Sequence, residues 1–477
     1  MAGLLRAGQY ELQEAKIVSM NGTEVDLTLS LLSLTLFEDI FRFTISGVMV
    51  VQDSVNLSSM LPLIGQEYLI LKLATASLSQ ENFIMDFTES KKFLVNKVSG
   101  RLDLGSGVQG YNLSFVSREL MIDQRTKVLQ SLVGTESDIV KGIYESNLDT
   151  KKKLFIEPSS GIRKIASPNK RPFELVQELM SSAISEKFSD ATYLNFETPR
   201  GFNFRSLASM YAQPSSMEYR SFVVGTNSKK GASNVEADFS VILEQNIVST
   251  QDSLNAHRMG TYGSVMYTHD AVSKRYRKYT YNYLEQFSKD NHIESTNARF
   301  NGKEVEDYAI VSASEITNSK ERISDFPART YVQPVSGVLS DKNQQNEFGE
   351  FPYSPNIPTQ RVQNRNSNID QLKRGYTVKL KVHGNTFVNA GDVVDINLPY
   401  TASTKTEKNE DYDKIYRGKF LVVRIRHDFS GPSTKSHTML VEGVKDSLTF
   451  ELPSAFNPEI VDDTRPEVET DLYSIEV

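Results

Sequence analysis

A glycine-rich segment has the spacing of a ligand-binding motif. Gly105-Ser106-Gly107-Val108-Gln109-Gly110 matches the glycine pattern of a dinucleotide-binding loop. Such a loop lies between a strand and a helix, because the helix N-terminus binds the pyrophosphate. Here the residues from Tyr111 to Phe115 follow, and they alternate between apolar and polar types, which is typical of a strand. The sequence therefore predicts a glycine-rich hairpin and not a nucleotide site.

The composition excludes several kinds of metal and thiol site. The chain has no cysteine, which rules out disulfides, cysteine-ligated zinc, iron–sulfur clusters and thiol catalysis. Its six histidines show neither HxH nor HExxH spacing, so we interpret them as structural residues and expect no metal and no cofactor. They are His257, His269, His292, His383, His427 and His437.

Acidic residues cluster in one segment, where paired carboxylates could serve sugar hydrolysis. Such catalysis needs a cleft and a defined separation of the two carboxylates, which a sequence does not show. Lysines are interspersed with the acidic residues, so we interpret the segment as a solvated mixed-charge loop without catalytic residues. It contains Glu407, Glu410, Asp411 and Asp413 with Lys405, Lys408 and Lys414.

Basic and aromatic residues alternate in a second segment. Side chains of these types can stack on single-stranded nucleic acid, but they are also common on exposed hairpins. The chain as a whole is acidic, with a net charge of −7, so we prefer the hairpin. The residues are Lys274, Arg275, Arg277 and Lys278 beside Tyr276 and Tyr279.

The length and composition are those of a folded, multi-domain chain. At 477 residues the chain is too long for one ordinary core, and we expect three or four domains. Its longest apolar runs, 45–51 and 68–73, have the length of strands and not of membrane spans. The N-terminus lacks the pattern of a signal peptide. We therefore expect a protein that is made and kept in the cytosol, without membrane insertion, unless a larger particle carries it out.

Periodicity predicts a mainly β chain with an α+β insertion. Alternating apolar residues dominate the first 120 residues and return after Gly375, whereas helical spacing marks the segment between about 121 and 215. Within that segment Thr135 and Asp138 resemble a helix-capping pair, and Pro172 suits a first helical turn. We predict a first β-barrel at 1–120, an intervening α/β domain at 121–218, a second β-barrel at 219–287 and 374–450, an excursion with a flexible loop and a helix at 288–373, and an acidic tail at 451–477.

An internal repeat relates the two predicted barrels. The segment that begins at Gly65 has a counterpart that begins at Gly391, and Lys92-Phe93-Leu94-Val95 is repeated as Lys419-Phe420-Leu421-Val422. The spacing between the two parts of each copy is nearly equal, which favours a duplicated domain over two unrelated sheets. Three such chains would place six similar units around one axis, so that a threefold object could meet a sixfold one.

Three segments, in this order, resemble the central baseplate hub proteins of contractile phage tails. They are Gln52 to Glu67, with Leu61-Pro62-Leu63-Ile64-Gly65; Phe196 to Leu207, with Pro199-Arg200-Gly201; and Val388 to Val394. This family is related to the hub part of type VI secretion spike proteins and to phage late-control proteins. The resemblance covers most of the chain, although none of the three segments is a strict signature.

The resemblance implies a structural and non-enzymatic virion protein. Hubs of this family are homotrimers whose two tail-tube-like barrels per chain form a pseudo-sixfold ring. The ring would bind the central spike on one side and the first tail tube ring or tube initiator on the other, with surrounding baseplate proteins as further partners. Viral DNA would pass through the lumen only as cargo, and the particle would assemble in the host cytoplasm.

Interface residues are therefore the functional residues that we expect. The candidates are the paired strands of the two barrels and the tail from Pro453 onward against the spike. A tail-tip peptidoglycan hydrolase and a receptor-binding tail protein remain alternatives. The candidate interface residues are Gly65, Glu67, Leu69, Gly391, Val393, Val394, Ile396, Pro453 and Phe456.

Overall fold

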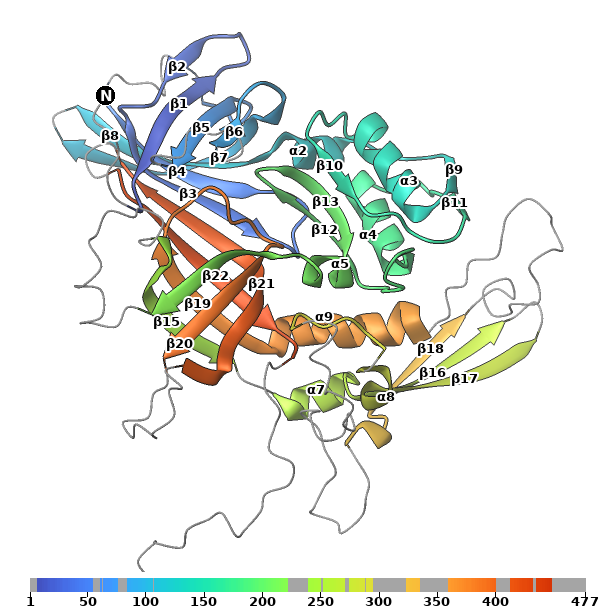
Figure 1. The fold of residues 1–477 in the computed structure, drawn as a ribbon. Helices are drawn as coiled ribbons and strands as arrows, with labels where there is room; N and C mark the ends of the chain where they lie inside the picture. Colours follow the sequence, from blue (N-terminus) through green and yellow to red (C-terminus); the bar gives the residue numbers. More distant parts are fainter. Residues whose placement is uncertain are drawn as a thin grey trace, which may run out of the picture.

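Strands dominate the described part of the chain in the computed structural model (Figure 1), and most of their pairings are antiparallel. The predicted fold class, mainly β with an α+β insertion, is confirmed. The acidic tail, the predicted flexible loop and most of the acidic segment around 407–411 lie outside the described residues. The structure describes residues 7–54, 61, 63–75, 84–105, 107–221, 239–249, 252–270, 274–287, 289–294, 323–334, 359–399, 412–431 and 435–447.

The first strands form a curved sheet around one apolar core, here called the N-terminal sheet. Its strands follow the order β2-β1-β5-β7-β8-β4-β3, with β6 added to β5. Among the described residues β1 and β3 do not pair, so this sheet does not close on itself. The strands are β1 (Tyr10–Val18), β2 (Glu24–Asp26), β3 (Leu31–Asp39), β4 (Ser46–Asp53), β5 (Tyr68–Thr75), β6 (Ile84–Phe87), β7 (Phe93–Gly105) and β8 (Val108–Ser117), with a short helix η2 (Glu89–Lys91) before β7.

The last strands form a closed six-stranded barrel, here called the C-terminal barrel. The pairing runs β21-β20-β14-β15-β19-β22 and returns to β21. Tyr376, Val378, Leu380 and Val382 alternate along one strand and point into its core, as their spacing predicts. The strands are β14 (Ser215–Ser221), β15 (Val241–Ser249), β19 (Tyr376–His383), β20 (Val393–Pro399), β21 (Tyr412–Ser430) and β22 (His437–Lys445).

The intervening domain packs helices against short strands around its own apolar core. The Thr135 hydroxyl accepts the backbone N–H of Asp138, which confirms the predicted cap. Pro172 begins the helix that runs to Ser182, as expected for a residue that lacks an N–H donor. The elements are α2 (Arg118–Arg125), β9 (Ser131–Gly134), α3 (Glu136–Gly142), η3 (Ile143–Asn147), β10 (Leu154–Ile156), β11 (Arg163–Ala166), α4 (Pro172–Ser182), β12 (Tyr193–Thr198), β13 (Gly201–Ser206) and α5 (Leu207–Tyr211).

A third, separate sheet corrects one predicted domain boundary. We expected 219–287 to belong wholly to the second barrel, but β16 and β17 pair with β18 in a sheet of three strands. Alternation identifies a strand but not the sheet that it joins. Figure 1 shows this sheet projecting to one side of α9. The elements are α7 (Ser253–Met259), β16 (Gly263–Asp270), β17 (Arg275–Asn282), α8 (Tyr283–Phe287), η8 (Ile323–Asp325), β18 (Arg329–Pro334), η11 (Thr359–Asn364) and α9 (Arg365–Arg374). Among the described strands, the parallel pairs are β14–β15, β14–β20, β10–β13 and β16–β18.

The segments with apparent chemical motifs are surface hairpins. The glycine-rich segment 105–110 joins β7 to β8, as predicted, and both Gly105 and Gly107 have positive φ. The basic and aromatic segment lies in β17 and pairs with β16 in an antiparallel hairpin. No helix among the described residues is long and apolar enough to cross a membrane.

Candidate functional site

The two halves of the chain share one strand, β21. Its first part pairs with β20, and from Arg424 to Ser430 it pairs with β3 of the N-terminal sheet, from Asp39 to Ser33. Along its other edge β21 pairs with β22. The N-terminal sheet and the C-terminal barrel are therefore one continuous sheet, joined at the β21–β3 pairing, which we call the internal seam (Figure 1).

Buried polar side chains cross this seam. The Nε2 atom of His427 lies 2.9 Å from Oε1 of Glu38 on β3, and its Nδ1 atom lies 3.2 Å from Nε2 of His437 on β22. All three side chains are buried, and burial lowers the pKa of His437 well below its ordinary value. The other oxygen of Glu38 accepts the backbone N–H of Ala390. These contacts connect β3, β21, β22 and the turn before β20, which is a structural role for His427.

The same strand order occurs in both halves. In the N-terminal sheet the run is β3-β4-β8-β7-β5, and in the C-terminal barrel it is β15-β19-β22-β21-β20. Every adjacent pair in both runs is antiparallel. In the second run, residues 250–375 stand between β15 and β19 in the chain, and they include the strands of the third sheet. Five strands in matching order are the structural counterpart of the sequence repeat.

The turns before β5 and β20 are also equivalent. Gly65 and Gly391 both have positive φ, at 83° and 87°. The next acidic residue in each copy, Glu67 or Asp392, uses its carboxylate to accept backbone N–H groups of its own turn. Its backbone carbonyl accepts an N–H from the neighbouring strand, that of Val95 or Val422. The two acidic residues therefore hold the same turn in both halves, and burial raises the pKa of Asp392.

Most of the predicted interface residues that the structure describes are buried inside the protomer. The side chains of Leu69, Val393, Val394 and Ile396 are fully buried in the apolar cores, and Glu67 is also buried. Both edges of β5 and of β20 are paired within the chain. Pro453 and Phe456 lie outside the described residues. The structure thus groups these residues into two equivalent strands, and their contact with another subunit stays a prediction.

A buried ion triad joins the N-terminal sheet to the intervening domain. The Lys152 Nζ atom lies 2.7 Å from Glu119 Oε2 and 2.7 Å from Glu197 Oε1. Glu197 also accepts the hydroxyl of Ser117 and the N–H of Ile45, which comes just before β4. Burial disfavours the charge on Lys152, but the two carboxylates outweigh it and raise its pKa. Sequence reasoning missed this triad, because its three residues are 33 and 45 positions apart.

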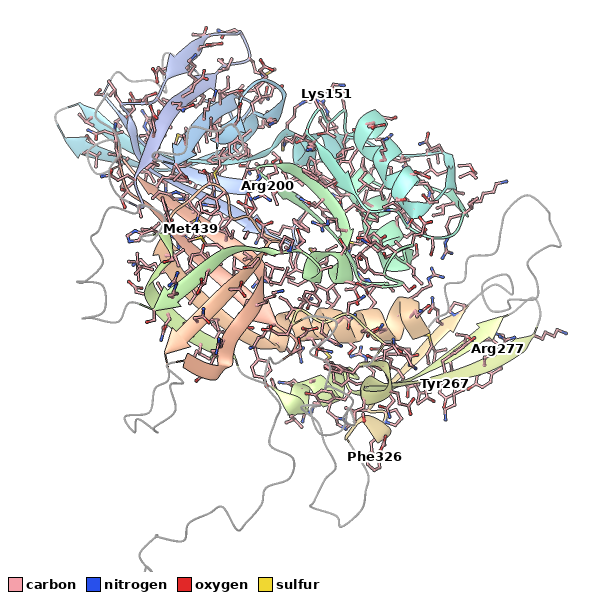
Figure 2. All side chains as sticks on the ribbon, in the orientation of Figure 1. Lys151, Arg200, Tyr267, Arg277, Phe326 and Met439 are labelled. Atoms are coloured by element: carbon pink, nitrogen blue, oxygen red, sulfur yellow. The ribbon has the colours of Figure 1, made fainter. Side chains whose placement is uncertain are left out.

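Arg200 makes a second junction, between the intervening domain and the C-terminal barrel (Figure 2). It lies in the turn between β12 and β13, and Gly201 follows it with positive φ. Its guanidinium donates to the carboxylate of Asp392, 3.3 Å away, and to the backbone carbonyl of Phe387. The Pro199-Arg200-Gly201 segment, which carries part of the sequence resemblance, therefore contacts the turn before β20, the counterpart of the turn before β5.

No family model matches the chain, and no curated protein matches it significantly. Solved structures do match. A tail protein from Neisseria meningitidis is 12% identical, with a TM-score of 0.50, over 92% of this chain and 97% of its own. The 43 kDa tail protein of prophage MuSo2 from Shewanella oneidensis is 8% identical, with a TM-score of 0.48, over 91% and 98%. The E. coli c3393 protein, a component of the type VI secretion system, is 8% identical, with a TM-score of 0.40, over 94% and 79%.

The Neisseria structure shows that this chain has the fold of a tail protein over nearly its whole length. The resemblance that the sequence indicated is thereby confirmed at the level of the fold.

Proposed function

We propose that this chain is a structural, non-enzymatic protein of a contractile phage tail, the homotrimeric central hub of its baseplate. The observation that carries the proposal is the five-strand order repeated in the two halves of the chain. Three chains with two similar units each would form a ring with six similar units, because symmetric subunits repeat the same contact around the axis. The tail-protein fold supports the same role.

In this proposal the ring adapts a sixfold tail tube to a threefold spike. One face binds the central spike and the other binds the first tube ring or tube initiator, while surrounding baseplate proteins bind the outside. DNA passes through the lumen as cargo. The protein works in the virion tail after assembly in the host cytoplasm.

The predicted interface residues keep a defined place in the proposal. Gly65, Glu67 and Leu69, with their counterparts Gly391, Val393, Val394 and Ile396, shape the two equivalent strands of the ring wall. The side chains of Glu67, Leu69, Val393, Val394 and Ile396 are buried in the protomer. In this proposal they act at the subunit interface by shaping these strands, and exposed residues add direct contacts between subunits. Pro453 and Phe456 contact the spike.

Sedimentation equilibrium of the purified chain, alone and with a candidate spike protein, tests the proposal. We expect a mass near three times 53.7 kDa for the chain alone, or that mass plus the mass of the bound spike when the trimer forms only with the spike. A chain that stays monomeric in both samples contradicts the hub, because the repeated units would have no ring to form. A receptor-binding tail protein would instead bind whole host cells.

A further inference from the structure

The internal seam shows how one half of the chain contacts the other. Residues Arg424–Ser430 of β21 pair antiparallel with Asp39–Ser33 of β3. If the two halves are equivalent units of a ring, the contact between neighbouring chains should repeat this seam with the equivalent strands. The counterpart of β21 is β7, and the counterpart of β3 is β15.

The equivalence of these strands extends to their irregularities. The β7–β8 register shifts between Val95 and Lys97, and the β21–β22 register shifts between Val422 and Arg424. Likewise, β3 shifts against β4 between Leu31 and Ser33, and β15 shifts against β19 between Ile242 and Glu244. Bulges specify register, so Val95 to Ser99 match Val422 to Arg426. Further along, β7 has two more shifts against β8, between Ser99 and Leu102 and between Asp103 and Gly105, that β21 lacks. There the match follows the neighbouring strands: Leu102 pairs with Gly110 of β8 as Asp428 pairs with Thr438 of β22.

β7 and β15 each have an open edge at the positions where their counterparts at the internal seam, β21 and β3, pair with each other. Among the described residues, β7 pairs with β5 only at Phe93 and Leu94, so the same edge is open from residue 96 onward. Within the residues that the structure describes, β15 pairs with β14 only at Val241 and Ile242, which leaves this edge of β15 open from residue 243. An open edge presents unpaired N–H and C=O groups that another strand can bind.

Apolar side chains on these edges are exposed where their counterparts are buried. Ile247 on β15 is 45% exposed, whereas its counterpart Leu36 at the internal seam is 2% exposed. Val98 on β7 is 37% exposed, whereas its counterpart Ile425 is 1% exposed. At the internal seam Leu36 packs in the core of the N-terminal sheet and Ile425 in the core of the C-terminal barrel. Further large apolar residues that are exposed on the two strands are Leu102, Leu104, Leu243 and Val248.

We propose that residues 97–105 of β7 in one copy pair antiparallel with residues 243–249 of β15 in a second copy of this chain, repeating the internal seam between subunits. This inference rests on the proposed trimeric hub and names its subunit contact. The contact is head to tail, since it joins two different strands, and a contact of this kind can close a ring of three copies, as the proposed trimer requires. By the matched registers, Leu102 of one copy lies opposite Asn246 of the next, as Asp428 lies opposite Thr35 at the internal seam.

A disulfide cross-link tests this pair. The side chains of Thr35 and Asp428 are hydrogen-bonded across the internal seam at 2.9 Å, so cysteines at the equivalent positions should lie within disulfide reach. The chain has no cysteine of its own, so a Leu102→Cys, Asn246→Cys double variant carries the only thiols. We expect a mild oxidant to convert the full-length double variant into a covalent species of three chains, which a reductant dissolves. Each single variant should stay one chain, and a mixture of the two should stop at two.

The outcomes separate this inference from the proposed function. If the wild-type chain sediments as a trimer but the double variant forms no cross-link, the hub stands and the seam is wrong. Covalent pairs alone from the double variant would indicate a twofold contact and would also overturn the seam. If the chain is monomeric even with the spike, the hub and the seam fail together.

A charge substitution gives a second, independent readout. Ile247→Lys places a charge in the proposed contact, and we expect it to shift the sedimenting species from three chains to one while the far-UV circular dichroism stays that of the folded wild-type chain. Val332→Lys is the matched control, because Val332 is 76% exposed on β18, outside the proposed contact. It should leave the trimer intact. An Ile247→Lys chain that remains trimeric would contradict the proposal.

Discussion

At the residue scale, the ion triad around Lys152 makes the stability of the chain depend on a buried charge. Replacement of Lys152 by Met would leave Glu119 and Glu197 buried without their cation. Breaking a buried ion pair in this way costs about 3–5 kcal/mol, because the remaining charge has no compensation. We expect the free energy of unfolding of Lys152→Met to fall by about that amount, measured by denaturant unfolding at pH 7.5.

The neighbouring Lys151 provides the control. Its side chain is 64% exposed beside Asp149 (Figure 2), so Lys151→Met should cause no measurable change. Adding Glu119→Gln and Glu197→Gln to Lys152→Met should recover most of the loss, because no unpaired carboxylate then remains. If Lys152→Met is as stable as Lys151→Met, the triad does not hold the junction.

Asp290 differs from the ion triad, because its negative charge destabilises the folded state. Burial, aided by the charge of Asp190, raises the pKa of Asp290 from 3.8 to about 6. The folded state therefore binds its proton more tightly, and stability falls as the pH rises from about 3.8 to about 6, then stays level. Asp290→Asn should raise the free energy of unfolding at pH 8 by on the order of 2–3 kcal/mol.

The gain from Asp290→Asn should shrink as the pH is lowered from 6 towards 4, which thermal unfolding at several pH values would show. Asp149→Asn is a suitable control, because Lys151 and Arg118 lower the pKa of that exposed carboxyl. It should bring no gain at any of these pH values. If the stability of Asp290→Asn depends on pH in the same way as that of the wild type, the pKa of Asp290 is not raised in the folded chain.

At the scale of the element, Gly65 and Gly391 form a matched pair. Both have positive φ, where any side chain costs about 1–2 kcal/mol. A Cβ atom at Gly65 would meet nothing closer than the Asn96 carbonyl oxygen at 3.6 Å, whereas at Gly391 it would lie 2.6 Å from Cζ of Phe196. Overpacking adds about 1–3 kcal/mol, so Gly391→Ala should be the more destabilising change. If chemical denaturation shows that Gly65→Ala and Gly391→Ala lower the free energy of unfolding equally, the turn at Gly391 relaxes away from Phe196.

At the scale of the whole molecule, the two halves depend on each other. The β3 edge is covered by β21, nearly 400 positions later in the chain. A fragment of residues 1–126 would expose that edge, and exposed edges promote association. We expect light scattering to show polydisperse assemblies of the fragment, at concentrations where the full chain forms one discrete species. A fragment that stays a uniform monomer would show that the N-terminal sheet closes without β21.

The sequence by itself determined the local structure and the duplication. The Thr135 cap, the Pro172 helix start, the hairpin at Gly105–Gly110 and the alternation from Tyr376 to Val382 follow from backbone preferences and side-chain periodicity, which act over a few residues. The repeat of Lys92 to Val95 also identified the two equivalent sheets.

Only the tertiary structure decided which strands meet. It separated β16 and β17 from the barrel, joined β3 to β21, and gathered Glu119, Lys152 and Glu197 at one junction. It also placed the predicted interface residues Val393, Val394 and Ile396 inside the protomer. The reason is that a strand pairs with whichever edge the rest of the fold leaves open, and local periodicity carries no information about that edge.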